Sequence, residues 1–111
     1  METKIKEKRK MALMNFKRKL LAAFGKDVLE LKVFGSQVRG DFRKDSDIDV
    51  LIVLKSLSSK KQQFIIDLTT QILFEYGIVI SPHVYSLREY SYLNRLPSVF
   101  MQILKREAVP L

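Results

Sequence analysis

The chain has 111 residues, of which 47% are hydrophobic and 29% are charged, and its formal net charge is +8. This length and composition are typical of one globular domain, so we expect residues 1–111 to form a single α/β domain with its own core. The chain has no cysteine, which excludes disulfides, and no run of ~18 apolar residues, which excludes a membrane span. It also has no signal-peptide pattern, so we expect a cytoplasmic protein with no membrane contact.

The first predicted element is an amphipathic helix that ends near Gly25. Its apolar stripe repeats at helical spacing through Leu13, Phe16, Leu20 and Phe24. Residues 1–20 hold eight Lys or Arg and two Glu, so the basic excess belongs to this helix. Such a charge run can attract nucleic acid, but it is more often a solvated helix face, and we favour the second interpretation.

A first strand is predicted over 29–34, and it leads directly into Gly35 and Ser36. A glycine after a strand lets the backbone approach a ligand closely and turn its N–H groups toward it. The Ser36 hydroxyl can donate a hydrogen bond to a phosphate oxygen. Taken alone, Gly-Ser at this place is usually only a turn.

Two aspartates, Asp47 and Asp49, open the second predicted strand, which continues over 50–54. Side chains alternate along a strand, so we expect these two carboxylates to share one face. Adjacent carboxylates repel each other unless a cation lies between them, and Mg²⁺ prefers oxygen ligands of this kind. The alternative is a solvated strand edge, where aspartate is common.

Arg39 lies in the polar loop between the two strands. If a short helix begins at Ser36, this guanidinium falls one turn later, close enough to bind phosphate. A surface ion pair with Asp41 or Asp45 is an equally weighted interpretation.

The second half of the chain predicts a helix, a strand and two more helices. An apolar stripe over 64–73, ended by Gly77, marks a helix between two strands, which favours a parallel pairing of strands 50–54 and 78–85. Pro82 indicates that the third strand lies at a sheet edge or carries a bulge. Ser86 and Glu89 form a capping box, and Pro97 separates its helix from a last one. We interpret the tyrosines of this region as a cover on the core; the alternatives are stacking of a base and contact with a partner. These residues are Tyr85, Tyr90 and Tyr92.

The combination of these motifs resembles a known family signature. The sequence Gly-Ser-x-x-Arg-Gly-Asp-x-x-x-x-Ser-Asp-Ile-Asp, from Gly35 to Asp49, is similar to that of the DNA polymerase beta-like nucleotidyltransferase superfamily. This version resembles the minimal nucleotidyltransferase branch, whose members are small and are often encoded beside a HEPN-domain partner. The resemblance implies a small mixed β-sheet flanked by helices and metal-dependent transfer of a nucleoside monophosphate.

The resemblance also implies the roles of individual residues. Asp47 and Asp49 would be the catalytic residues and Mg²⁺ ligands. Gly35, Ser36 and Arg39 would bind the nucleotide.

One position departs from the family pattern. Full polymerase-type sites carry a third acid on the strand over 78–85, and here Ser81 or His83 occupies that neighbourhood. His83 is a possible general base, because an imidazole titrates near neutral pH, although a lone histidine is more often a hydrogen-bonded structural residue.

The expected function is therefore transfer of AMP from ATP, or of another nucleotide, to a hydroxyl of a partner macromolecule. The resemblance implies a HEPN toxin as the partner, with this chain as its antitoxin. Because no second domain is expected to bind the acceptor, another protein or a second copy of this chain would have to bring it.

Two alternatives remain open. A degenerate enzyme that only binds nucleotide or sequesters its toxin is favoured by the missing third acid. Nucleic-acid binding through the basic first helix, which we consider less favoured, would depend on Lys8, Arg9 and Lys10.

Overall fold

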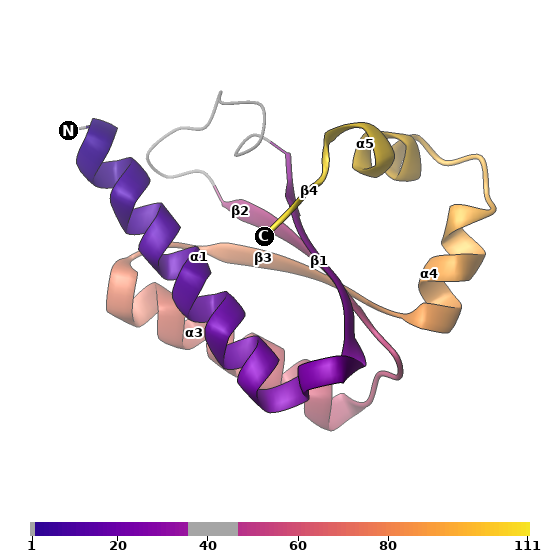
Figure 1. The fold of residues 1–111 in the computed structure, drawn as a ribbon, viewed down its shortest axis with the longest axis horizontal. Coiled ribbons are helices and arrows are strands. Elements are labelled where there is room, and N and C mark those ends of the chain that lie inside the picture. Colours follow the sequence, from indigo (N-terminus) through magenta and orange to yellow (C-terminus); the bar gives the residue numbers. More distant parts are fainter. Residues whose placement is uncertain (1, 36–46) are drawn as a thin grey trace.

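The computed structural model describes residues 2–35 and 47–111 of the chain, and side chains from residue 6 onward. Figure 1 shows helices packed on both sides of a narrow twisted sheet. No helix within the described ranges is both long and apolar enough to cross a membrane. In chain order the elements are α1 (Glu2–Phe24), a 3-10 turn η1 (Gly25–Asp27), β1 (Val28–Phe34), β2 (Ile48–Leu54), α3 (Ser59–Tyr76), β3 (Ile80–Ser86), α4 (Leu87–Asn94), α5 (Val99–Glu107) and β4 (Val109–Pro110).

The sheet is mixed, with the strand order β3-β2-β1-β4. β1 pairs antiparallel with both β2 and β4, whereas β2 pairs parallel with β3. The predicted α/β class, the parallel pairing across α3 and the edge position of the strand that contains Pro82 are confirmed. The short strand β4, which pairs Val109 with Val33, was not predicted.

One face of the sheet is covered by α1 and α3, which lie side by side in Figure 1. Side chains from both helices enclose alternate residues of β2 in the larger core cluster. This arrangement follows from the strand alternation, because every second residue of a strand faces the same layer. The buried residues of this cluster are Ala12, Leu13, Phe16, Leu20, Val33, Ile48, Val50, Ile52, Leu54, Ile65, Leu68, Ile72, Ile78 and Ile80.

A smaller cluster lies on the opposite face, where α4 and α5 pack. Its buried members are Phe34, Leu51, Val53, Met101 and Leu104. Strand register aligns Phe34 with Asp49, and Asp49 with Ser81, across three neighbouring strands. This row of three aligned residues therefore crosses the sheet at the end where β1 finishes and β2 begins.

Several predicted helix ends are confirmed. Gly25 and Gly77 follow α1 and α3 with positive φ values of 52° and 68°, a conformation that glycine adopts without steric cost. Ser86 and Glu89 form both hydrogen bonds of the capping box, at 3.1 and 3.0 Å. Phe64, which we placed on the buried stripe of α3, is 39% exposed and instead packs edge-on against Phe24.

Candidate functional site

The candidate site lies where the C-terminal end of β1 meets the N-terminal end of β2. Phe34 is paired with Asp49, and Gly35 follows with a φ of +80°. A Cβ atom at Gly35 would lie 2.6 Å from the Oδ2 atom of Asp49, which is too close for two non-bonded atoms. Only glycine therefore lets the backbone of this turn and the carboxylate lie so near each other.

Replacing Gly35 by alanine should displace the Asp49 carboxylate. Both Gly35→Ala and the control Gly25→Ala place a side chain at positive φ, so each should lose about 1 kcal/mol of stability. No other atom lies within 4 Å of a Cβ at Gly25, whereas the one at Gly35 meets Asp49. Because His83 is the sole histidine of the chain and bonds Asp49, only Gly35→Ala should shift its ring resonances in NMR spectra. Unchanged resonances in that variant would contradict this packing.

The two sequence-predicted aspartates flank a buried residue. Ile48, between them, is 0% exposed in the core under α1 and α3, and its N–H donates to the Val79 carbonyl at 2.9 Å. Asp47 precedes β2 and is exposed, whereas the side chain of Asp49 is 31% exposed. The edge of the sheet formed by these strand ends thus presents one exposed and one partly exposed carboxylate.

His83 contacts Asp49 from the neighbouring strand. Its Nε2 atom lies 3.2 Å from Asp49 Oδ1, within hydrogen-bond distance. The ring meets Phe34 edge-on, with centroids 4.9 Å apart, and lies 5.9 Å from the ring of Phe100 on α5. Two residues were considered for the place of the third acid. His83 bonds Asp49, whereas Ser81 is the residue of β3 that pairs with Asp49 in the strand register. The imidazole is therefore held by two aromatic rings with one nitrogen directed at the carboxylate.

Sequence reasoning misplaced Arg9, which was assigned to the solvated basic face of the first helix. Its side chain is 1% exposed. Burial lowers the pKa of Arg9, and the negative charge of Asp47 acts in the opposite direction. The missed signal was its spacing, because Arg9 precedes Ala12, Leu13 and Phe16 by three, four and seven residues, on the buried stripe of α1.

The donor groups at this edge fit a Mg²⁺ ion that arrives with a phosphate ligand. Among the side chains of residues 6–35 and 47–111, no three His, Asp or Glu are placed to enclose a metal by themselves. Mg²⁺ does not need such a cage, because it commonly takes one or two carboxylates, waters and substrate phosphates. Asp47 and Asp49 would supply the carboxylates, and the missing Cβ at Gly35 lets the Asp49 carboxylate lie directly against the turn. Ser36 and Arg39 lie outside the described residues.

The tyrosines lie away from this edge. The rings of Tyr85 and Tyr90 are 6.3 Å apart and pack against the smaller core cluster, as predicted for a core cover. Burial raises the pKa of both phenols above the ordinary tyrosine value. Tyr92 is 59% exposed and lines a separate groove with Arg88 and Arg95.

Comparison with known proteins identifies a family and several relatives of this chain. The profile of the family described as "Nucleotidyltransferase domain" matches residues 13–106. A Methanocaldococcus jannaschii protein named "Putative protein adenylyltransferase" is 39% identical over 70 residues, which are 61% of this chain and 71% of that protein. A second protein of the same name and organism is 36% identical over 75 residues, covering 68% of this chain and 71% of its own length.

Solved structures with the same fold include two relevant proteins. A structure described as a "putative minimal nucleotidyltransferase" superposes with a TM-score of 0.54 at 26% identity, covering 98% of this chain and 94% of that one. A toxin–antitoxin complex with AMP-PNP contains a chain with a TM-score of 0.56 at 18% identity, covering 86% and 69%. The second likeness concerns the fold alone. By sequence and by fold, this chain belongs to the nucleotidyltransferase domain family.

Proposed function

We propose that this chain transfers AMP from ATP to a hydroxyl of a partner protein. The observation that carries the proposal is the packing of Asp49 against the positive-φ turn at Gly35. This packing places a carboxylate beside a backbone turn of the kind that binds phosphate. The names of the Methanocaldococcus jannaschii relatives support adenylyl transfer to a protein.

In this proposal, separate residues at the sheet edge bind the metal and the nucleotide. Asp47 and Asp49 hold Mg²⁺, while Gly35 and Ser36 hold the β- and γ-phosphates with help from Arg39. The metal, when bound, neutralises charge on the phosphates. His83 orients Asp49 through its 3.2 Å contact, and Phe34 and Phe100 restrain the imidazole.

The reaction is a displacement at the α-phosphorus of ATP. The acceptor oxygen forms a bond to that phosphorus, the bond to the oxygen that bridges to the β-phosphate breaks, and pyrophosphate leaves. The proton of the acceptor hydroxyl passes to a base at the site. Because catalysis of this kind depends mainly on positioning and charge neutralisation, the fixed orientation of Asp49 is central to the proposal.

We propose a HEPN-domain toxin as the acceptor protein, with a tyrosine hydroxyl as the acceptor group and this chain as the antitoxin. The solved toxin–antitoxin complexes that share the fold support a toxin partner. The resemblance of the Gly35–Asp49 segment to the minimal nucleotidyltransferase signature supports a HEPN partner.

A second candidate is inhibition of the toxin by binding alone. The observation that favours it is that His83 already bonds Asp49 from β3, the strand on which the resemblance implies a third acid and on which this chain has Ser81 and His83 instead. A site with two carboxylates clamps metal less strongly than a site with three. The two candidates differ in whether AMP becomes covalently attached to the partner.

Labelled ATP separates the two candidates. The chain, Mg²⁺ and the HEPN-domain protein encoded beside it are incubated with ATP labelled at the α- or γ-phosphate. We expect label on the partner from α-labelled ATP only, and its loss in Asp47→Asn. Lys60→Ala, which changes an exposed residue on α3, is the matched control and should retain full transfer. Inhibition of the toxin without label, unaffected by Asp47→Asn, would instead establish sequestration.

A further inference from the structure

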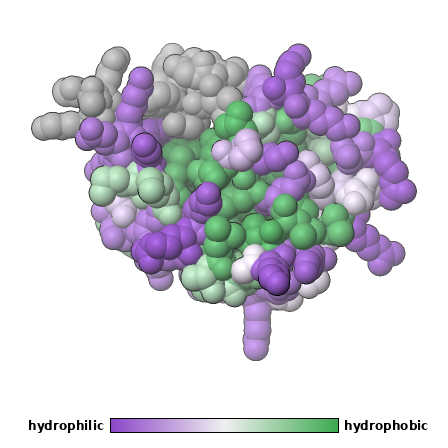
Figure 2. All heavy atoms as spheres, in the orientation of Figure 1, coloured by the Kyte–Doolittle hydropathy of each residue, from purple (hydrophilic) through white to green (hydrophobic). Residues whose placement is uncertain are grey.

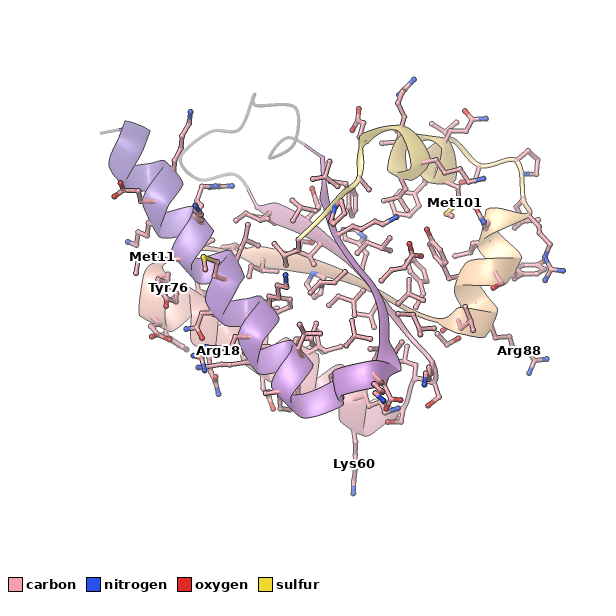
Figure 3. All side chains as sticks on the ribbon, viewed as in Figure 1. Met11, Arg18, Lys60, Tyr76, Arg88 and Met101 are labelled. Carbon is pink, nitrogen blue, oxygen red and sulfur yellow. The ribbon has the colours of Figure 1, made fainter. Side chains whose placement is uncertain are left out.

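A groove outside the candidate site lies between α1 and the C-terminal end of α3. Its volume is about 480 Å³. Figure 3 shows Met11 and Tyr76 close together on these two helices, with Arg18 further along α1. The lining residues are Met11, Met14, Asn15, Arg18, Glu75 and Tyr76.

The floor of this groove is held in place by hydrogen bonds. Asn15 Nδ2 donates to the Tyr76 hydroxyl at 3.0 Å and, at 3.5 Å, to Glu75 Oε2. Arg18 in turn donates to Asn15 Oδ1 at 2.9 Å. These bonds fix the Tyr76 ring and the Arg18 guanidinium before any partner binds, which lowers the entropy cost of binding.

The rim of the groove is apolar and accessible. Met11 and Met14 are 58% and 60% exposed, although both are large apolar side chains. Figure 2 shows pale green apolar atoms over this part of α1, bordered by purple hydrophilic residues. Methionine side chains adapt to irregular partner surfaces, and Met, Tyr and Arg are enriched in the cores of protein interfaces. The composition of the groove therefore fits a protein partner better than a nucleic acid, whose phosphates do not contact methionine favourably.

Three cations and one carboxylate, Glu75, lie around the apolar rim. Lys8 and Lys10 are exposed on the turns of α1 that precede Met11 and Met14. The Nζ atom of Lys8 would lie 3.7 Å from a Cβ at Gly77, so this side chain reaches the turn that links α3 to β3. Together with Arg18, these cations favour a partner that carries carboxylates beside its apolar side chains.

The groove is also close to the candidate site. Lys8 reaches the turn at Gly77. Two residues further on, the Val79 carbonyl accepts a hydrogen bond at 2.9 Å from the N–H of Ile48, which is adjacent to Asp47. A partner seated over Lys8 and Met11 would therefore lie beside the edge of the sheet that carries Asp47. Such a position suits a protein that presents an acceptor hydroxyl to the site.

We propose that this groove docks an acidic amphipathic segment of the acceptor protein, with apolar side chains against Met11 and Met14 and carboxylates near Lys8, Lys10 and Arg18. The inference rests on the proposed function, because it assigns the groove to the protein that receives AMP. A second copy of this chain is a poorer occupant, because two chains of net charge +8 repel each other.

The test follows the methionine methyl groups by NMR. The chain is labelled with ¹³C at the methionine methyls and titrated with a synthetic helical peptide that has leucines on one face and glutamates on the other. A scrambled peptide of the same composition controls for charge, and an oligouridylate controls for nucleic-acid binding. We expect the amphipathic peptide alone to shift Met11 and Met14. Met101, which is 3% exposed on the other side of the sheet, should stay unchanged.

Two sets of variants complete the test. Met11→Gln with Met14→Gln should weaken binding of the amphipathic peptide about tenfold, because the apolar contacts carry the affinity. Arg18→Glu should weaken it by a similar factor, whereas Arg88→Glu, which makes the same charge change on α4, should not. Thermal unfolding of each variant verifies that it folds.

Three results would overturn the proposal. They are tighter binding of the oligouridylate at Met11 and Met14, equal binding of the scrambled peptide, and unchanged methyl resonances at saturating peptide. Because this titration contains no ATP or Mg²⁺, its failure is distinct from failure of AMP transfer, which the labelled-ATP experiment measures.

Discussion

The variant Asp49→Asn is expected to lose about a thousandfold in the rate of AMP transfer, while its fold stays intact. Asparagine has the shape of aspartate, and its Oδ1 atom can still accept a hydrogen bond from His83 Nε2, so the 3.2 Å contact should persist. The variant lacks only the negative charge that the proposal assigns to Mg²⁺ binding. Losing that charge should raise the barrier by about 4 kcal/mol, since each 1.36 kcal/mol is worth about tenfold in rate.

The measurement is the initial rate of transfer from α-labelled ATP under saturating Mg²⁺, with thermal unfolding as the test of folding. Asp67→Asn is the matched control, because Asp67 is an exposed carboxylate on α3 that accepts a hydrogen bond from Gln63 at 2.9 Å. Its substitution should leave the rate unchanged. A rate for Asp49→Asn within about threefold of the unsubstituted chain would remove this carboxylate from the catalytic machinery.

The parts of the fold that were predictable depend on short-range patterns. The end of α1 at Gly25 and of α3 at Gly77 follows from glycine at positive φ after a helix. The parallel pairing of β2 with β3 follows from a helix of one crossover length between them. In contrast, β4 has two residues, too few for any periodicity, and its pairing with β1 depends on where α5 ends.

The candidate site was predictable in its parts but not in its contacts. The segment from Gly35 to Asp49 indicated a nucleotide site from its order of residue types alone. The sequence left Ser81 and His83 as alternatives, because it does not determine the register of β3 against β2. That register pairs Leu51 with His83, on the same face as Asp49, and the imidazole reaches back to the carboxylate. The close approach of Gly35 to Asp49 is likewise a tertiary contact that no local pattern reveals.

Arg9 is the largest departure from a sequence-based expectation, and it leads to the second major prediction. Arg9→Ala should cost about 3 kcal/mol of stability, because it removes a large side chain that is 1% exposed and leaves a cavity at the buried stripe of α1. For a chain of this size the melting temperature should fall by about 12 °C or more.

Lys8→Ala, which changes the exposed neighbour on the same helix turn, should alter stability by less than about 0.5 kcal/mol. Arg9→Lys should give an intermediate loss, because lysine keeps the charge near Asp47 but lacks the planar guanidinium. Equal melting temperatures for Arg9→Ala and Lys8→Ala would restore the interpretation of α1 as a uniformly solvated basic helix.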